Sequence, residues 1–184
     1  ADELRSLGAA NVRSLYRGVR FSADVETLYR INYRSRLATR ATAAPDFSLP
    51  QHQNLTRSAA NIAWEEILSL DKTFAITASV SNSAITHSLY ASQCLKDGIA
   101  DYFNAKYGKR PSVDTDNPDV RINLHIERNK AVVSLDTSGE SLHKRGYRQS
   151  GIDAPMQETL AAALIRTSAW DGERPLLDCM CGSG

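Results

Sequence analysis

The sequence predicts an α+β protein made of two small units and the beginning of a third. Three observations along its 184 residues lead to this prediction. Helical and strand-like hydrophobic periods alternate along the chain. Pro45 and Pro50 bracket a short linker, after which the pattern starts again. The last residues, 175–184, are an apolar run followed by a glycine loop of the kind that connects a strand to a helix.

The composition is that of a globular protein and excludes several classes. Hydrophobic residues make up 42% and charged residues 23%, and 22 Lys+Arg against 21 Asp+Glu leave a formal net charge of only +1. The net charge by itself therefore does not indicate a nucleic-acid-binding protein. The chain has no apolar run of about 18 residues and no signal-peptide pattern, so we expect a cytoplasmic protein without a membrane segment.

The cysteine count predicts neither a disulfide framework nor a metal site. There are three cysteines, Cys94, Cys179 and Cys181. An odd number with one distant member makes no disulfide framework. The closing pair lacks the further Cys or His ligands of a tetrahedral zinc site. We expect reduced cysteines and no metal.

The first unit, residues 1–50, begins with a helical segment over 2–7 that ends at Gly8. Two short strand-like runs follow, over 11–15 and 18–22, and predict a hairpin. Asp24 is the expected N-cap of the next helix, in which Val25, Leu28, Tyr29 and Asn32 recur at helical spacing. Residues 36–44 alternate as a strand. This order matches the later part of a ferredoxin-like unit whose first strand is inferred.

The second unit, residues 51–150, opens with a helix within 52–68 that places Leu55, Ala59 and Ile62 on one side. Residues 73–81 alternate as a strand. The longest helix is expected over 86–106, ending at Gly108. The apolar stripe expected on this helix consists of Leu89, Tyr90, Leu95, Ile99, Tyr102 and Phe103.

A strand hairpin is expected next. Residues 119–128 alternate between apolar and polar side chains. Asn129-Lys130 can turn the chain into the following run over 131–139. His125 falls on the polar face, where exposure is a better explanation than catalysis.

The third segment, residues 151–184, predicts a helix over 155–170 with Pro155 in its first turn, followed by a strand over 176–178. A strand, an acidic residue and Gly-x-Gly can bring a ligand against the backbone. An ordinary connecting loop is the alternative, because short glycine motifs are weak signals.

A basic loop over 138–148, "SGESLHKRGYR", gathers His143, Lys144, Arg145 and Arg148 around Tyr147. Its cations could contact phosphates and its tyrosine could stack on a base. A solvated basic turn is the alternative explanation.

In this order, "SGESLHKRGYR", "APMQETLAAALI" and "LLDCMCGSG" resemble the junction in bacterial RNA guanine-N2 methyltransferases that carry a THUMP domain. The stretches "NIAWEEIL", "TFAITASVSNSAITHSLYASQCLKDGIADYF" and "RPSVDTDNPDVRINLHI" resemble the THUMP region of that family. The first 50 or so residues resemble its N-terminal ferredoxin-like region. The resemblance covers nearly the whole chain.

The resemblance implies a partial ferredoxin-like unit, a THUMP domain and the first helix and strand of a Rossmann-like methyltransferase domain. It implies S-adenosylmethionine as the methyl donor and a guanine of large-subunit ribosomal RNA as the substrate. Carried over by position, the donor-binding candidates are Pro155, Glu158, Thr159, Asp178, Cys181, Gly182 and Gly184. Cys179 stands where the family usually has proline, which loosens the loop but removes no expected ligand atom.

The same resemblance implies that the 184 residues bind the donor weakly and are inactive by themselves. The Asn-Pro-Pro-Tyr type motif that holds the target base amine does not occur in them. We therefore expect no catalytic residue in this chain and interpret it as a part of a longer enzyme, cut at both ends.

RNA binding is the function expected of the chain itself. The candidate RNA-binding cations, which could form one basic face, are Lys96, Arg110, Arg121, Lys144, Arg145 and Arg148. Phosphate contacts would make binding salt-dependent, with little base specificity.

Two alternatives stay open. One is a stand-alone RNA-binding or scaffold protein, against which the closing glycine loop argues. The other is a THUMP enzyme that acts on transfer RNA. The oligomeric state is left undetermined. For the aromatic residues, Trp64 and Trp170 are expected to be packing anchors, and Tyr29, Tyr90 and Tyr102 are assigned to the core.

Overall fold

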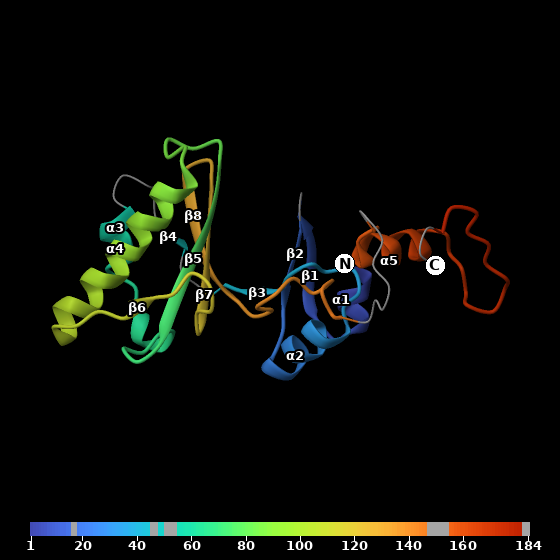
Figure 1. Ribbon diagram of the computed structural model, residues 1–184, viewed down its shortest axis with the longest axis horizontal. Coiled ribbons are helices and arrows are strands. Elements are labelled where there is room, and N and C mark those ends of the chain that lie inside the picture. Colours follow the sequence, from blue (N-terminus) through green and yellow to red (C-terminus); the bar gives the residue numbers. More distant parts are fainter. Residues whose placement is uncertain (16–17, 45–47, 50–54, 147–154, 182–184) are drawn as a thin grey trace. The chain divides into compact units, whose positions relative to one another are not determined.

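Figure 1 shows the computed structural model, which describes residues 1–15, 18–44, 48–49, 55–146 and 155–181. The chain divides into two compact units. Ala1–Ala41 and Glu140–Gly184 form the first, here called the terminal unit, and Thr42–Gly139 forms the second, the central unit. The chain therefore leaves the terminal unit after residue 41 and returns to it at residue 140.

The terminal unit begins with α1 (Asp2–Ser6), β1 (Ala10–Leu15), β2 (Gly18–Ser22) and α2 (Val25–Arg34). The predicted N-terminal helix is confirmed, and Gly8 follows it with a φ of 99°, a conformation that suits glycine. β1 and β2 pair antiparallel, which confirms the hairpin. The small core of this unit consists of Leu4, Ala9, Ile31 and Ala41.

Helix α2 begins where the sequence predicts but buries a different face. The Asp24 carboxylate accepts a hydrogen bond from the Thr27 amide at 2.7 Å, which confirms the cap. The buried residues are Thr27 and Ile31, whereas Val25 and Tyr29 are 70% and 73% exposed. The predicted apolar stripe was therefore wrong for Val25 and for Tyr29, a predicted core residue, whereas Leu28 of the same stripe packs against the core. Thr27 lies on the inner face, which made that face appear polar in the sequence.

The strand predicted over 36–44 is wrong except for β3 (Thr42–Ala43). Side-chain bonds hold the chain after α2 instead. The Glu3 carboxylate accepts hydrogen bonds from the Ser35 hydroxyl at 2.7 Å and from the Arg36 amide at 2.8 Å. Ser35 is 1% exposed. These contacts fix a turn where the alternating sequence indicated a strand.

The central unit contains a six-stranded sheet in the order β3-β8-β7-β5-β6, and β4 (Ser48–Leu49) also pairs with β8. The other strands are β5 (Thr73–Ser81), β6 (Ser112–Val113), β7 (Val120–Glu127) and β8 (Lys130–Asp136). β5 and β7 pair in parallel from Phe74 opposite Val120 to Ser81 opposite Glu127. Pro45 and Pro50 of the predicted linker lie outside the described residues, and β4 lies between them.

Helices α3 (Leu55–Ala59) and α4 (Ser88–Tyr107) cover one face of this sheet (Figure 1). The predicted strand over 73–81 and both predicted helices are confirmed, although the first helix is shorter. Gly108 ends α4 with a φ of 64°. Trp64, in the short 3-10 helix η2 (Trp64–Glu66), is fully buried and donates its indole N–H to the Ala59 carbonyl at 2.7 Å. It is the packing anchor that the sequence suggested.

The core lies between the helices and the sheet. Its α4 members are Ala91, Leu95, Ile99 and Phe103. The sheet contributes Phe74, Ile122, Leu124, Ile126, Ala131 and Val133. Two residues of the predicted α4 stripe do not belong to it, because Leu89 is 72% and Tyr90 is 58% exposed. Both lie in the first turn of the helix.

The hairpin of β7 and β8 is confirmed. Its turn is formed by Arg128 and Asn129, at φ values of 47° and 62°, one residue earlier than the predicted Asn129-Lys130. Two successive positive φ values match the twist of antiparallel strands in a tight hairpin. The Asn129 side-chain carbonyl also accepts hydrogen bonds from the Ser83 hydroxyl at 3.0 Å and the Ala84 amide at 2.9 Å, and so connects this turn to the end of β5.

The last segment forms α5 (Glu158–Thr167), with Gln157 as its N-cap residue. Pro155 therefore precedes the helix, and its predicted place in the first turn was wrong. The strand predicted over 176–178 is also absent from the described structure, and Leu177 is 84% exposed. A strand needs a neighbour for its backbone groups, and residues 176–178 are paired with none in the described part of the chain. In the part of the chain that the structure describes, no helix is long and apolar enough to cross a membrane.

Candidate functional site

The basic loop is anchored on the terminal unit by Arg145. Its guanidinium donates hydrogen bonds to the carbonyls of Asn32 (2.8 Å), Tyr33 (2.5 Å) and Ser35 (2.7 Å) at the end of α2, and to that of Leu142 (2.8 Å). The last carbonyls of a helix lack intrahelical donors and attract positive charge. Arg145 therefore caps α2. This side chain, which the sequence predicts to bind RNA, is already bonded to carbonyl groups of the protein.

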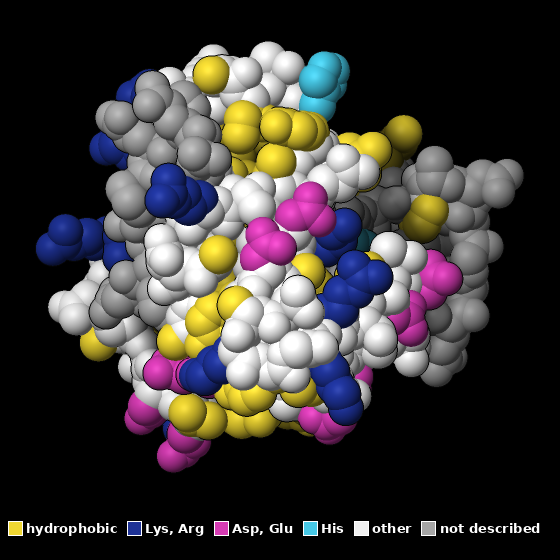
Figure 2. All heavy atoms as spheres, turned by 90° about the vertical axis from the view of Figure 1, so that its left-hand side faces the viewer, with side chains coloured by type: hydrophobic (Ala, Val, Ile, Leu, Met, Phe, Trp, Pro, Cys, Tyr) yellow, Lys and Arg dark blue, Asp and Glu magenta, His cyan; other side chains and the backbone are white. Residues whose placement is uncertain are grey.

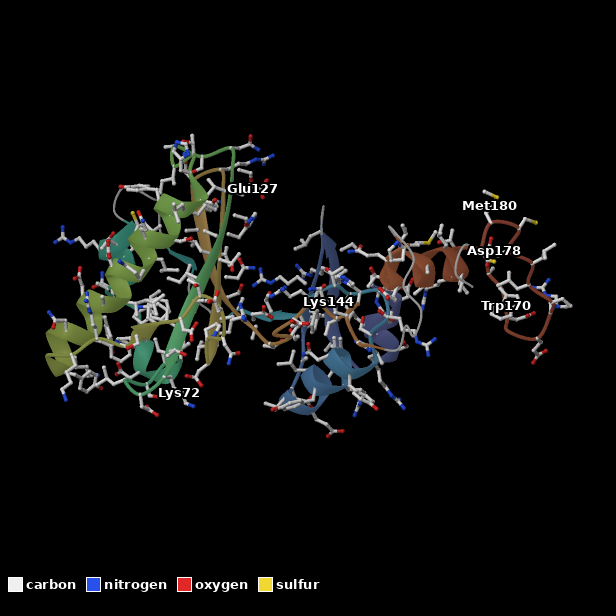
Figure 3. The ribbon with its side chains drawn as sticks, viewed as in Figure 1. Lys72, Glu127, Lys144, Trp170, Asp178 and Met180 are labelled. Atoms are coloured by element: carbon white, nitrogen blue, oxygen red, sulfur yellow. The ribbon has the colours of Figure 1, made fainter. Side chains whose placement is uncertain are left out.

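Other residues of the basic loop are also bonded within the terminal unit. The Leu142 amide and the Ser141 hydroxyl both donate to the Thr39 carbonyl, at 2.8 and 3.1 Å. The Ser141 hydroxyl also lies 2.8 Å from the His143 Nδ1. Lys144 is exposed, and Figure 3 places it on the loop in the terminal unit. Tyr147 and Arg148 lie outside the described residues.

The other three predicted cations lie in the central unit. The Lys96 amine is 2.8 Å from the Asp97 carboxylate on α4. Arg121, at the start of β7, donates to the Asp116 carbonyl at 3.0 Å. Arg110 is exposed and lines a depression of about 360 Å³ together with Asp101 and Asn104.

The structure separates Lys96 from Arg121. Lys96 belongs to the helix layer that covers one face of the sheet. Arg121 precedes the buried Ile122, and successive strand residues point to opposite faces, so Arg121 lies on the face away from α4. On the side that Figure 2 shows, basic and acidic side chains are interspersed. The predicted single basic face is not formed within the central unit.

The predicted donor-binding residues do not form an enclosed site among the described residues. Glu158 opens α5, where its carboxylate suits the positive end of the helix dipole, and Thr159 is 9% exposed. Asp178 and Cys181 lie on the exposed loop after α5, on which Figure 3 labels Asp178 and Met180. The Asp178 carboxylate accepts a hydrogen bond from the Met180 amide at 2.9 Å. Gly182 and Gly184 lie outside the described residues.

The groups with shifted pKa values described next take part in contacts that hold the fold together. Hydrogen bonds from the Thr27 side chain and amide lower the pKa of Asp24. The Thr73 amide and hydroxyl lower the pKa of Asp119, which connects the starts of β5 and β7. The bond between Lys106 and Glu65 raises the pKa of the first and lowers that of the second. Among the described residues, no cluster of His, Cys, Asp and Glu could hold a metal ion.

The sequence reasoning missed the outer face of α2. Tyr33 is 82% exposed beside the exposed Tyr29, and Arg34 and Arg36 are also exposed. The signal in the sequence is the spacing of Thr27 and Ile31. Residues four apart share one side of a helix, so a buried Thr27 and Ile31 leave Tyr29 and Tyr33 on the outer face.

Comparison with known families divides the chain into three parts. Residues 1–41 match the RlmL ferredoxin-like domain, residues 52–136 the THUMP domain, and residues 145–184 the RMKL-like methyltransferase domain. Over its whole length the chain is similar to the THUMP-containing methyltransferases K/L. The first family match falls in the terminal unit, the THUMP match in the central unit and the methyltransferase match on α5 and its flanking residues.

Relatives and solved structures agree with this assignment. The "Ribosomal RNA large subunit methyltransferase K/L" of Syntrophotalea carbinolica is 43% identical over 189 residues, and that of Allochromatium vinosum is 45% identical over 190 residues. Both matches cover 100% of this chain and 26% of the relative, so the chain spans about a quarter of their length. SMU.472, whose crystal structure is a complex with SAH, matches with a TM-score of 0.78 and 27% identity over 100% of this chain and 48% of its own.

Proposed function

We propose that the chain is the RNA-binding N-terminal part of a cytoplasmic, S-adenosylmethionine-dependent methyltransferase that modifies the N2 of a guanine in 23S ribosomal RNA. The observation that carries this proposal is the order of the three domain matches along one chain. The similarity of the whole chain to ribosomal RNA methyltransferases K/L supports the choice of RNA.

In this proposal, residues 1–150 hold the RNA and residues 151–184 begin the domain that transfers the methyl group. Lys144 and Arg110 are the exposed cations best placed to contact phosphates. Arg145, Lys96 and Arg121 already contact carbonyl or carboxylate oxygens of the protein. Arg145 therefore supports RNA binding by holding Lys144 in place.

The methyl donor is assigned to S-adenosylmethionine because SMU.472 was crystallised with SAH. Glu158 and Thr159 at the start of α5, with Asp178 and Cys181 on the loop, would hold the donor, which supplies the methyl group. These 184 residues contain no Asn-Pro-Pro-Tyr type motif for the target base. We propose that they bind the donor weakly and transfer no methyl group by themselves.

RNA binding is tested by fluorescence anisotropy of a labelled 23S ribosomal RNA hairpin across a salt series. The chain should bind with an affinity that falls as salt rises, and Lys144→Ala should reduce the salt slope by about one. Lys72→Ala is the control, because this lysine pairs with Asp119 at 3.5 Å and is no predicted ligand. Absence of binding by the folded chain at low salt would contradict the proposal.

The modified base is tested in cells from which the gene is deleted. Mass spectrometry of nucleosides from their 23S ribosomal RNA should show the loss of one N2-methylguanosine, restored by the intact gene. An unchanged 23S profile with a loss in transfer RNA would reassign the substrate.

A further inference from the structure

We propose that the outer face of α2 is a stacking platform for unpaired RNA bases, formed by Tyr29 and Tyr33. The inference rests on the proposed RNA-binding function and adds a base contact to it. Tyr29 is 73% and Tyr33 is 82% exposed, and Val25 on the same face is 70% exposed. Three large apolar side chains in one row on a helix surface are typical of an interaction site.

The spacing of the two tyrosines suits successive unstacked bases. Residues four apart lie on the same face of a helix, with Cβ atoms roughly 5–6 Å apart. Aromatic side chains in this arrangement can each accept one base of a single strand, since every base has a π-face. A regular duplex offers no free base faces to such a surface, so the partner is single-stranded.

The charge around the tyrosines favours a polyanion. Residues 24–40 carry four arginines, at 30, 34, 36 and 40, and two carboxylates, Asp24 and Glu26. Both carboxylates are engaged, Asp24 by the Thr27 amide and Glu26 by Arg30 at 2.6 Å. The exposed Arg34 and Arg36 leave this surface positive, which suits phosphates.

The hydrogen bonds of Arg145 hold the end of α2 that carries the platform. Arg145 binds the carbonyls of Asn32, Tyr33 and Ser35, so the end of α2 is fixed at the residue that carries one of the two rings. The neighbouring Lys144 is exposed. A strand whose bases stack on Tyr29 and Tyr33 can therefore place a phosphate near this amine.

The experiment uses the 184-residue chain and a short single-stranded RNA that carries one 2-aminopurine. Tyr29→Ala and Tyr33→Ala should each weaken binding about tenfold at every salt concentration, without a change in salt slope. They should also remove the quenching of the 2-aminopurine. The matched Tyr29→Phe and Tyr33→Phe variants keep the ring and should retain both affinity and quenching. Lys144→Ala should instead lower the salt slope by about one.

The outcomes separate this inference from the proposed function. Salt-dependent RNA binding that is unchanged in a folded Tyr29→Ala/Tyr33→Ala double variant would overturn the platform and leave the proposed function standing. Equal binding of a blunt duplex with the same tyrosine dependence would exclude base stacking. Self-association that depends on the two tyrosines, measured by ultracentrifugation, would assign the face to a second copy of the chain. If the folded chain binds no RNA at low salt, the proposed function itself fails.

Discussion

At the scale of single residues, Arg145 and Lys144 are neighbours with different roles. The sequence treats both as cations of one basic loop. In the structure the Arg145 guanidinium is bonded to four carbonyls, three of them at the end of α2, whereas Lys144 is exposed. The planar fork of arginine can bridge several acceptors, which a lysine amine cannot do in the same geometry.

We expect Arg145→Ala to lower the free energy of unfolding of the terminal unit by about 2 kcal/mol, because charged hydrogen bonds to backbone acceptors are lost. Arg145→Lys should recover only part of this loss. Lys144→Ala should leave stability within about 0.5 kcal/mol, as for most exposed positions. Urea denaturation followed by circular dichroism measures all three. Equal stability of Arg145→Lys and the unsubstituted chain would show that only charge matters.

Asp24 gives a prediction about pH. Its pKa is lowered below the ordinary 3.8 by the hydrogen bonds from Thr27. A carboxyl group with a lowered folded pKa stabilises the native state above its unfolded pKa, and this contribution is lost as pH falls through the folded value. Asp24→Asn keeps an acceptor for the cap without titrating.

The stability difference between the chain and its Asp24→Asn variant should therefore be constant above about pH 5 and shrink as pH falls below about 4. Thermal melts across this range measure it. A difference that stays constant down to about pH 2 would show that Asp24 does not stabilise α2 through its charge.

At the scale of elements, α3 and α4 approach closely at Gly98. A Cβ atom at this position would lie 2.5 Å from the Ala59 Cβ and 2.6 Å from the Thr56 carbonyl oxygen. Gly98 is buried within α4. The glycine therefore permits the contact of the two helices, although glycine is unfavourable inside a helix by about 1 kcal/mol.

We expect Gly98→Ala to destabilise the central unit by about 1–3 kcal/mol, since the steric overlap outweighs the gain in helix propensity. Ala105→Gly, at an exposed position of the same helix, measures the propensity term alone and should cost about 1 kcal/mol. Chemical denaturation compares the two. A Gly98→Ala variant more stable than the unsubstituted chain would mean that α3 moves away freely.

At the scale of the molecule, the chain consists of two units with separate cores. The core of the central unit is the larger and centres on sheet residues and α4, whereas the terminal unit packs few side chains around Ile31. Because burial of apolar surface is the main driving force of folding, the terminal unit should be the less stable one.

Trp64→Ala should lower the free energy of unfolding of the central unit by about 3–5 kcal/mol, because removal of this fully buried side chain leaves a cavity in the core. Native-state hydrogen exchange should then show faster exchange in β5 and β7, with unchanged protection factors in α2. Loss of protection in both units by the same factor would show that they unfold together.

Features that depend on neighbours in the sequence were predicted correctly. The Asp24 cap, the glycine end of α4, the alternation of β7 and its hairpin with β8 all follow from contacts within a few residues, although the turn lies one residue earlier than predicted. The motifs of the basic loop, the following helix and the glycine loop predicted the ferredoxin-like, THUMP and methyltransferase parts, which the domain matches confirm.

The tertiary structure alone decided which side chains are buried and which candidate ligands remain free. Residues 36–41 and 176–178 have strand-like sequences, but a strand forms only when another strand pairs with its backbone. Arg145 bonds to carbonyls 110–113 positions away in the sequence, and Tyr29 is exposed because the opposite side of α2 packs on the core. By itself, the sequence determined the three domain types, the start of α2, the end of α4 and most of the strands, because these depend on local periods, caps and motifs. Burial, pairing and free charge depend on groups that are distant in the chain and meet only in the folded protein.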